Sequence, residues 1–156
     1  ERYLMGLLHS RALGSGLDAV EDKVLQAQMS TLSFVQPSHI DLKPRLAHGP
    51  RWERGKLSLQ RMAAFSYPED KMNALAECVS HLGRQMDMHD ASFVRLLALC
   101  MIRTQPSQLH SQLEYAARFV HPDRLWAAEL GMPLSLARAA MQWLAIQDPS
   151  TMGPHL

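Results

Sequence analysis

The chain has 156 residues, of which 47% are apolar and 20% charged, and its formal net charge is +1 with neutral histidines. These values fit one globular domain with a buried core, and so small a net charge gives no overall attraction to nucleic acid or acidic membranes. The longest apolar run, from Leu96 to Ile102, is too short to span a bilayer. Ten methionines and only 6% aromatic residues favour helix-on-helix packing over a β-sandwich.

Apolar residues recur with a helical period in the first part of the chain. They predict one helix over residues 2–12, ended by the Gly-Ser-Gly segment 14–16, and a second over residues 18–34. Three prolines then predict a loop over residues 36–50, pinned to the core by Ile40 and Leu42.

Residues 51–65 predict a further helix, which Gly55 weakens. Pro68, preceded by a serine and followed by two acids, is a favourable start for the next helix, which ends in a loop at residues 86–89. Asp90 is a natural N-cap for a helix over residues 91–103. That helix is apolar nearly all round, as expected at the centre of a bundle.

The last third predicts three helices. The first covers residues 107–120, the second begins at Pro122 and is stopped by Gly131, and the third runs from Pro133 to about Ile146. No segment alternates with a period of two. We therefore expect an all-α fold, a single compact layered domain of about seven helices over residues 1–147, followed by a flexible tail over residues 148–156.

Motifs for phosphate-binding loops, nucleophile elbows and paired metal ligands are absent from the sequence. The eight histidines are scattered, and Asp87-Met88-His89-Asp90 mixes hard and soft ligands, so we expect no metal site and no cofactor. Cys78 and Cys100 lie within apolar helical patterns and are interpreted as buried, reduced thiols, although the sequence does not exclude a disulfide.

Three stretches resemble the Vps-nine (vacuolar protein sorting nine) domain family, in order and at the family's spacing. The first follows a Thr-Pro-x-His-Leu-Asp-Ile pattern and the second a Pro-x-x-Lys-Leu helix start. The third matches Ala-Asp-Asp-Phe-Leu-Pro-x-Leu, then Pro-Pro-x-Leu-x-Ser and Tyr-Ile-x-Arg-Phe. In this sequence the matching residues are 36–42, 68–72 with Leu75, 90–97, 106–111 and 114–119.

The resemblance implies a layered helical domain that promotes nucleotide exchange on Rab-five-type small GTPases. The GTPase would dock in an apolar groove between the helix after Asp90 and the last helix, and an acidic "finger" would enter its nucleotide site. The positions implied to contact the partner are Ala91, Phe93, Val94, Arg95, Met132 and Ser135.

This sequence departs from the family pattern at those positions. Strict register places the finger at Ala91, so Asp90 acts as the catalytic acid only if the helix start shifts by one residue; a plain N-cap role is the alternative. Arg95 replaces a proline, Met132 replaces a functional tyrosine, and Ser135 keeps the hydroxyl of a threonine.

Two functional hypotheses follow from the resemblance. The first is a regulator of a Rab-type GTPase, rather than a classical enzyme, that acts in the cytoplasm and is recruited to endosomal or vesicle membranes. The alternative is a non-catalytic module of the same fold that binds a Rab or holds a partner in a larger trafficking complex. Neither hypothesis involves nucleic acid.

Overall fold

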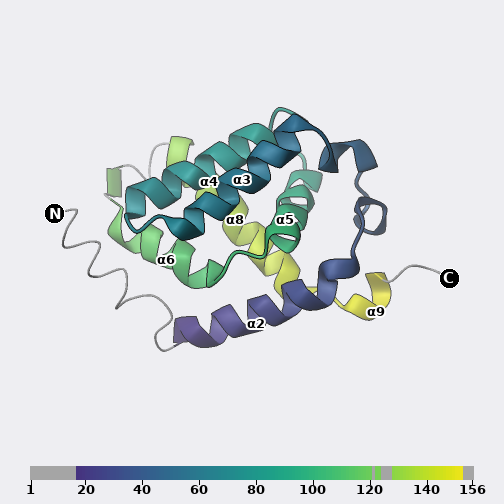
Figure 1. Ribbon diagram of the computed structural model, residues 1–156, viewed down its shortest axis with the longest axis horizontal. Coiled ribbons are helices and arrows are strands. Elements are labelled where there is room, and N and C mark those ends of the chain that lie inside the picture. Colours follow the sequence, from purple (N-terminus) through teal and green to yellow (C-terminus); the bar gives the residue numbers. More distant parts are fainter. Residues whose placement is uncertain (1–16, 121, 124–127, 153–156) are drawn as a thin grey trace.

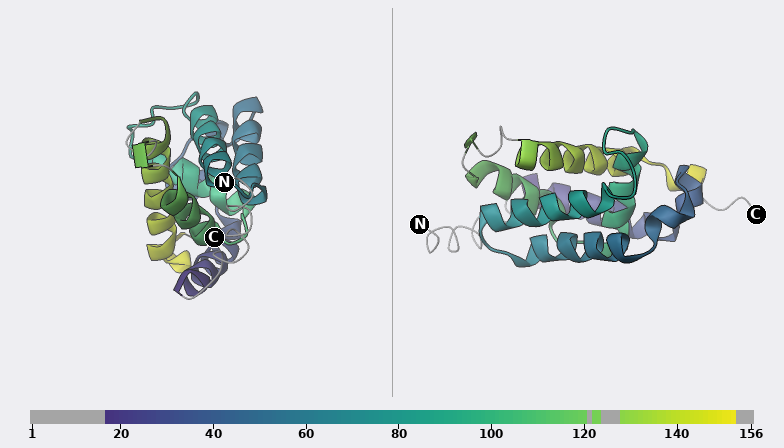
Figure 2. Two further views of the ribbon diagram at one scale, coloured as in Figure 1. Left: turned by 90° about the vertical axis from the view of Figure 1, so that its left-hand side faces the viewer. Right: turned by 90° about the horizontal axis from the view of Figure 1, so that it is seen from above.

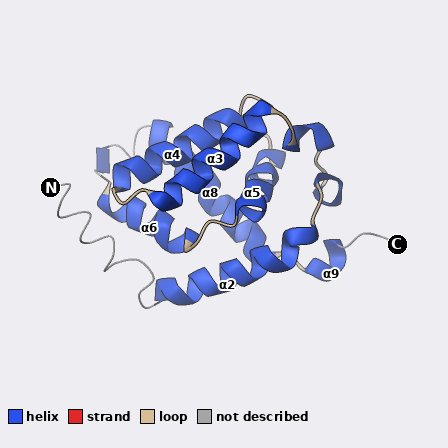
Figure 3. Ribbon diagram, in the orientation of Figure 1, coloured by secondary structure: helices blue, strands red, loops and turns tan. Residues whose placement is uncertain are grey.

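The secondary structure of the computed structural model is helical throughout the part of the chain that it describes, residues 17–120, 122–123 and 128–152 (Figure 3). This confirms the prediction of an all-α fold; the helix expected over residues 2–12 lies outside the described residues. The elements are α2 (Leu17–Thr31), η1 (Leu32–Phe34), η2 (Pro37–Ile40), η3 (Pro44–Ala47), α3 (Pro50–Ala64), α4 (Pro68–Leu82), α5 (Ser92–Thr104), α6 (Leu109–Phe119), α8 (Ala128–Ile146) and α9 (Pro149–Met152).

The helices form layers around α5. Helices α3 and α4, joined by a short link, lie side by side in Figure 1, and α2 runs along the opposite edge. Seen from the end in Figure 2, α8 and α3 lie on opposite sides, with α4, α5 and α6 between them. As its apolar composition predicts, α5 is central: it packs on both α8 and α3, and its residues from Leu96 to Ile102 are all buried.

Helices α3 and α8 each contain residues that disfavour a helix: Gly55 in α3, and Gly131 and Pro133 in α8. A Cβ at Gly55 would stand 2.9 Å from Cδ2 of Leu82, so the glycine allows α3 and α4 to approach closely. The predicted break at Gly131 is wrong, because α8 continues through Gly131 and Pro133. An unbroken helix keeps Leu130 and Leu134, four residues apart, on one buried face, and this burial outweighs the local propensities.

The flexible tail predicted for residues 148–156 also needs correction. Residues 149–152 form α9, and Met152 is buried in the core. Asp148 starts this turn by accepting a hydrogen bond from the Ser150 backbone N–H at 2.9 Å. A single apolar residue in a polar segment gave little signal for this docking.

Four buried polar side chains join the helices: Lys71, Gln112, Asp22 and Ser111. The Lys71 ammonium of α4 is fully buried; it donates to the Met62 carbonyl oxygen at 3.2 Å and to the Gln112 side-chain oxygen. Asp22 of α2 accepts hydrogen bonds from the backbone N–H of Ser111, at 2.9 Å, and from the Ser111 hydroxyl, near the start of α6. These bonds tie α3, α4 and α6 together and fix α2 against α6. The thiols of the core are free, as predicted, and buried.

Candidate functional site

The loop between α4 and α5, residues 83–91, is built from successive side-chain and backbone turns. The Asp87 carboxylate accepts the His89 backbone N–H at 2.9 Å, and the Asp87 carbonyl oxygen accepts the Asp90 N–H at 3.1 Å. At its other end, the Gln85 side chain donates to the Leu46 carbonyl oxygen at 2.9 Å, which fastens the loop to η3. The loop is therefore held in a defined conformation although it is at the surface.

Asp90 lies exposed at the end of this loop. Its carboxylate accepts the backbone N–H of Ser92, the first residue of α5, at 2.8 Å. The backbone and hydroxyl hydrogen bonds from Ser92, aided by the charge of Arg95, hold the pKa of Asp90 below its ordinary value. Asp90 is thus ionised at neutral pH and closes a turn just ahead of α5, while Ala91, the N-cap residue, is exposed and offers only a methyl group.

The first turn of α5 points mostly inward. Phe93 is fully buried, which corrects the expectation that it contacts a partner: it anchors the helix start in the core. Val94 is half-buried and packs on the same core. The Arg95 guanidinium donates to the Ile40 carbonyl oxygen and to the Ser92 hydroxyl, both at 2.8 Å, so it braces η2 against α5.

A hollow of about 310 Å³ lies between α4 and α8, next to this loop. We name it the α4–α8 hollow. Its lining residues are Ala76, Val79, Ser80, Gly83, Arg84, Met88, Met132 and Pro133. The structure therefore brings Met132, predicted as a partner contact, to the loop that ends at Asp90. Ser135 is exposed one turn further along α8 and does not line the hollow.

Met132 is the one lining residue that was predicted as a site residue, and Met88 is among those that sequence reasoning missed. A Cβ at Gly83 would stand 2.9 Å from Cγ of Met88 and 3.0 Å from the Val79 carbonyl oxygen, so the glycine lets the thioether lie against the end of α4. Met88 is flanked by Asp87 and His89, and two methionines, Met86 and Met88, in an otherwise polar loop were the available signal. Its flexible side chain suits an adaptable contact surface.

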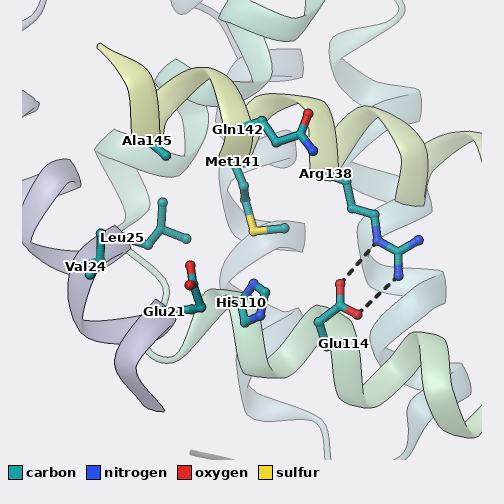
Figure 4. A pocket seen from close by; sticks show the side chains of 9 residues that line it. All are labelled: Glu21, Val24, Leu25, His110, Glu114, Arg138, Met141, Gln142 and Ala145. Atoms are coloured by element: carbon teal, nitrogen blue, oxygen red, sulfur yellow. Dashed lines mark hydrogen bonds and ion pairs between the residues drawn. The ribbon is translucent and has the colours of Figure 1, made fainter. Parts of the chain in front are cut away.

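A second hollow, of about 300 Å³, lies between α2, α6 and α8 (Figure 4). We name it the α2–α8 hollow. It is lined by Glu21, Val24, Leu25, His110, Glu114, Arg138, Met141, Gln142 and Ala145. Arg138 and Glu114 pair across its edge, with N···O distances of 3.2 and 3.3 Å. It contains none of the residues predicted for partner binding.

The site offers one ionised carboxylate, apolar contacts and a surface loop. Within the described residues, no three histidine, cysteine or acidic side chains come together as a metal site would require. None of the helices in the described part of the chain is long and apolar enough to cross a membrane. The arrangement combines an apolar hollow with an ionised carboxylate on the loop beside it.

Comparisons with known proteins agree with this arrangement. The family model of the vacuolar sorting protein 9 (VPS9) domain matches residues 52–146, more than half of the 156-residue chain. The chain therefore belongs to the VPS9 domain family. The match includes α4, the loop, α5 and all of α8; the α4–α8 hollow lies between α4, the loop and α8.

Curated relatives carry related names. "Vacuolar protein sorting-associated protein 9A" of Oryza sativa subsp. japonica is 28% identical over 137 residues, which is 80% of this chain and 28% of that protein. "Vacuolar protein sorting-associated protein vps901" of Schizosaccharomyces pombe is 26% identical over 140 residues, 86% of this chain and 24% of that protein. The chain thus spans about a quarter of the length of these two relatives.

Proposed function

We propose that this domain binds a small GTPase of the Rab-five type and promotes release of its GDP in endosomal or vesicle trafficking. It would act in the cytoplasm, at the surface of the membranes that carry the GTPase. The observation that carries the proposal is an exposed, ionised Asp90 at the end of the loop whose Met88 borders the α4–α8 hollow. Membership of the VPS9 family and the vacuolar sorting names of the relatives support it.

The hollow would seat the partner. Its volume of about 310 Å³ is enough for one or two apolar side chains, and the side chains of Met88 and Met132 can adjust to their shape. A buried apolar anchor surrounded by polar residues is the usual core of a protein interface. Arg84, at the edge of the hollow, supplies a cation to the polar rim.

Asp90 would then act on the nucleotide site. A GTPase holds phosphate and magnesium with backbone N–H groups and a lysine, all suited to negative charge. A carboxylate placed there repels the phosphates and stabilises the emptied site, so no covalent chemistry is needed. The lowered pKa of Asp90 keeps it charged at neutral pH.

The hydrogen bond from Ser92 does not lock Asp90 in place. Losing one hydrogen bond of this kind costs about 1 kcal/mol, which corresponds to roughly fivefold in an equilibrium constant. Binding energy of an ordinary interface exceeds this several times. Asp90 could therefore leave Ser92 on binding and take the role that the register assigns to Ala91.

The alternative function, binding without exchange, is favoured by the same hydrogen bond. If Asp90 stays on Ser92, the position nearest the nucleotide is the methyl group of Ala91, and Met132 lacks the hydroxyl of the tyrosine it replaces. The domain would then hold a Rab or an assembly partner without releasing GDP.

Release of fluorescent GDP from a Rab-five-type GTPase separates the two functions. Asp90→Ala should abolish acceleration if Asp90 is the acidic finger. Asp87→Ala is the matched control, because it removes a carboxylate with the same turn-forming role from the same loop. Ala91→Asp places an acid in the family register and should increase release in either case. Binding without acceleration supports the alternative, and absence of binding contradicts both.

A further inference from the structure

Helix α3 presents an exposed stripe in which cations and apolar side chains alternate. Arg54, Leu57 and Arg61 follow at intervals of three and four residues and so lie on one face of the helix, and Phe65 follows directly after its last residue. All four are exposed, and Leu57 and Phe65 are among the few large apolar side chains left at the surface. The stripe is therefore both basic and apolar.

Further basic residues lie near one end of this stripe: Arg51 on α3, His81 on α4 and Arg84 just after α4. The pKa of His81 is lowered first by its partial burial, and then by the positive charges of Arg51, Arg54 and Arg84, while Glu77 acts in the opposite direction. Guanidinium groups from α3 and from the end of α4 thus act on one point. We call the stripe together with Arg51, His81 and Arg84 the basic face.

The cations of the basic face are available for a ligand. Glu53, the acid nearest in sequence, pairs with Lys56 at 3.3 Å. Among the described residues, none of Arg51, Arg54 and Arg84 forms an ion pair. Two acids, Asp70 and Glu77, lie beside Arg61 and Phe65 in the groove between α3 and α4, so the surplus of positive charge is concentrated at the Arg51–Arg54–Arg84 end.

We propose that the basic face docks this domain on an anionic membrane surface, with Leu57 and Phe65 entering the headgroup boundary and the guanidinium groups meeting lipid phosphates. Alternating basic and apolar side chains on one helix face are typical of helices that lie on such interfaces. A fluid headgroup layer supplies phosphate oxygens wherever the guanidinium groups lie, whereas a folded partner would need acceptors at matching positions. The membrane therefore fits the stripe better than an acidic protein does.

Vesicle co-sedimentation tests the proposal. The full 156-residue chain should bind vesicles with about 30 mol % anionic lipid, but not neutral vesicles, and high salt should release it. Each cation near such a surface contributes about fivefold, so three cations raise partitioning roughly a hundredfold over neutral vesicles. Failure to bind anionic vesicles at about 0.1 M salt overturns the proposal.

Matched variants show whether the basic face is the site. Arg54→Gln should weaken binding to anionic vesicles about fivefold. Lys23→Gln makes the same charge change at an exposed position of α2 and should leave this binding unchanged. Leu57→Ser should weaken binding at constant charge. Equal losses in Arg54→Gln and Lys23→Gln indicate only a non-specific charge effect and contradict the proposal.

Solution assays keep this inference separate from the proposed function. Arg54→Gln and Leu57→Ser should leave GDP release from a lipid-free GTPase unchanged, since both residues lie outside the α4–α8 hollow. If Arg54→Gln instead weakens binding of the soluble GTPase, the basic face is a protein interface and the membrane proposal is wrong. If no GTPase binds but anionic vesicles do, only the proposed function fails.

Discussion

The α4–α8 hollow and the α2–α8 hollow have nearly equal volumes, about 310 and 300 Å³, but different walls. The α2–α8 hollow is bounded by helices alone, and an ion pair between Glu114 and Arg138 spans its edge. The α4–α8 hollow is bounded on one side by the loop that carries Met88 and ends at Asp90. A loop and two thioethers can adjust to a partner, whereas helix walls fixed by buried polar bonds resist such adjustment.

Lys71 holds α3, α4 and α6 together, and α4 and α6 each line one of the hollows. The pH dependence of its contribution to stability is the largest effect we expect. Burial lowers the pKa of Lys71 to about 8. The folded state therefore loses this proton near pH 8 but the unfolded chain only near 10.5, so stability rises with pH between these values. The gain is about 3 kcal/mol at most. The free energy of unfolding of the wild type, minus that of Lys71→Met, should increase by this amount from pH 7.5 to 10.5; a constant difference contradicts the assignment.

The second largest effect should come from a charge introduced into the α4–α8 hollow, compared with the same charge at the α2–α8 hollow. Met132→Lys places an ammonium group in the α4–α8 hollow and should weaken GTPase binding at least about a hundredfold, because an unpaired cation would be buried under the partner. Ala145→Lys, at the edge of the α2–α8 hollow, is the control and should bind as the wild type does. Equilibrium binding measures the affinity of both variants for the GTPase, and melting temperatures show whether both are folded. Equal losses of affinity would show that the hollows do not differ as partner sites.

Removing Asp22 should loosen the α2–α8 hollow specifically. Asp22→Ala leaves the buried Ser111 N–H and hydroxyl without acceptors, which costs about 2 kcal/mol. Urea unfolding should show this loss, and Asp22→Asn should restore part of it. GTPase binding by the folded fraction should not change; if it does, the two hollows are coupled through α6.

The ion pair across the α2–α8 hollow should matter least. Both side chains of the Arg138–Glu114 pair are partly exposed, and such pairs contribute about 0.5 kcal/mol. Arg138→Ala should lower the free energy of unfolding by about that much, and less at high salt. A loss as large as that of Asp22→Ala would mean that the pair fixes the helices as strongly as the buried bonds do.

Local sequence signals accounted for most of the helices. Pro68 with its two acids marked the start of α4, and the apolar run of α5 marked the central helix, because capping and periodicity act over a few residues. The candidate functional site was harder to predict from the sequence than the helices were. Asp90 was identified as a helix-start residue and as the candidate acid, whereas Phe93, expected to contact a partner, is buried, since periodicity does not tell which face of a nearly all-apolar helix meets solvent.

By itself, the sequence determined an all-α chain of the VPS9 type, with Asp90 at a helix start and an alanine in the acidic register. Only the tertiary structure decided that α8 runs unbroken through Pro133, that Lys71 is buried with the Met62 carbonyl and the Gln112 side chain as acceptors, and that Met88 meets Met132 at one hollow. It also brought Arg51, Arg54 and Arg84 near enough to His81 to add to the lowering of its pKa by burial. Capping and periodicity are local properties of the chain, whereas burial and the meeting of distant side chains depend on how the helices pack.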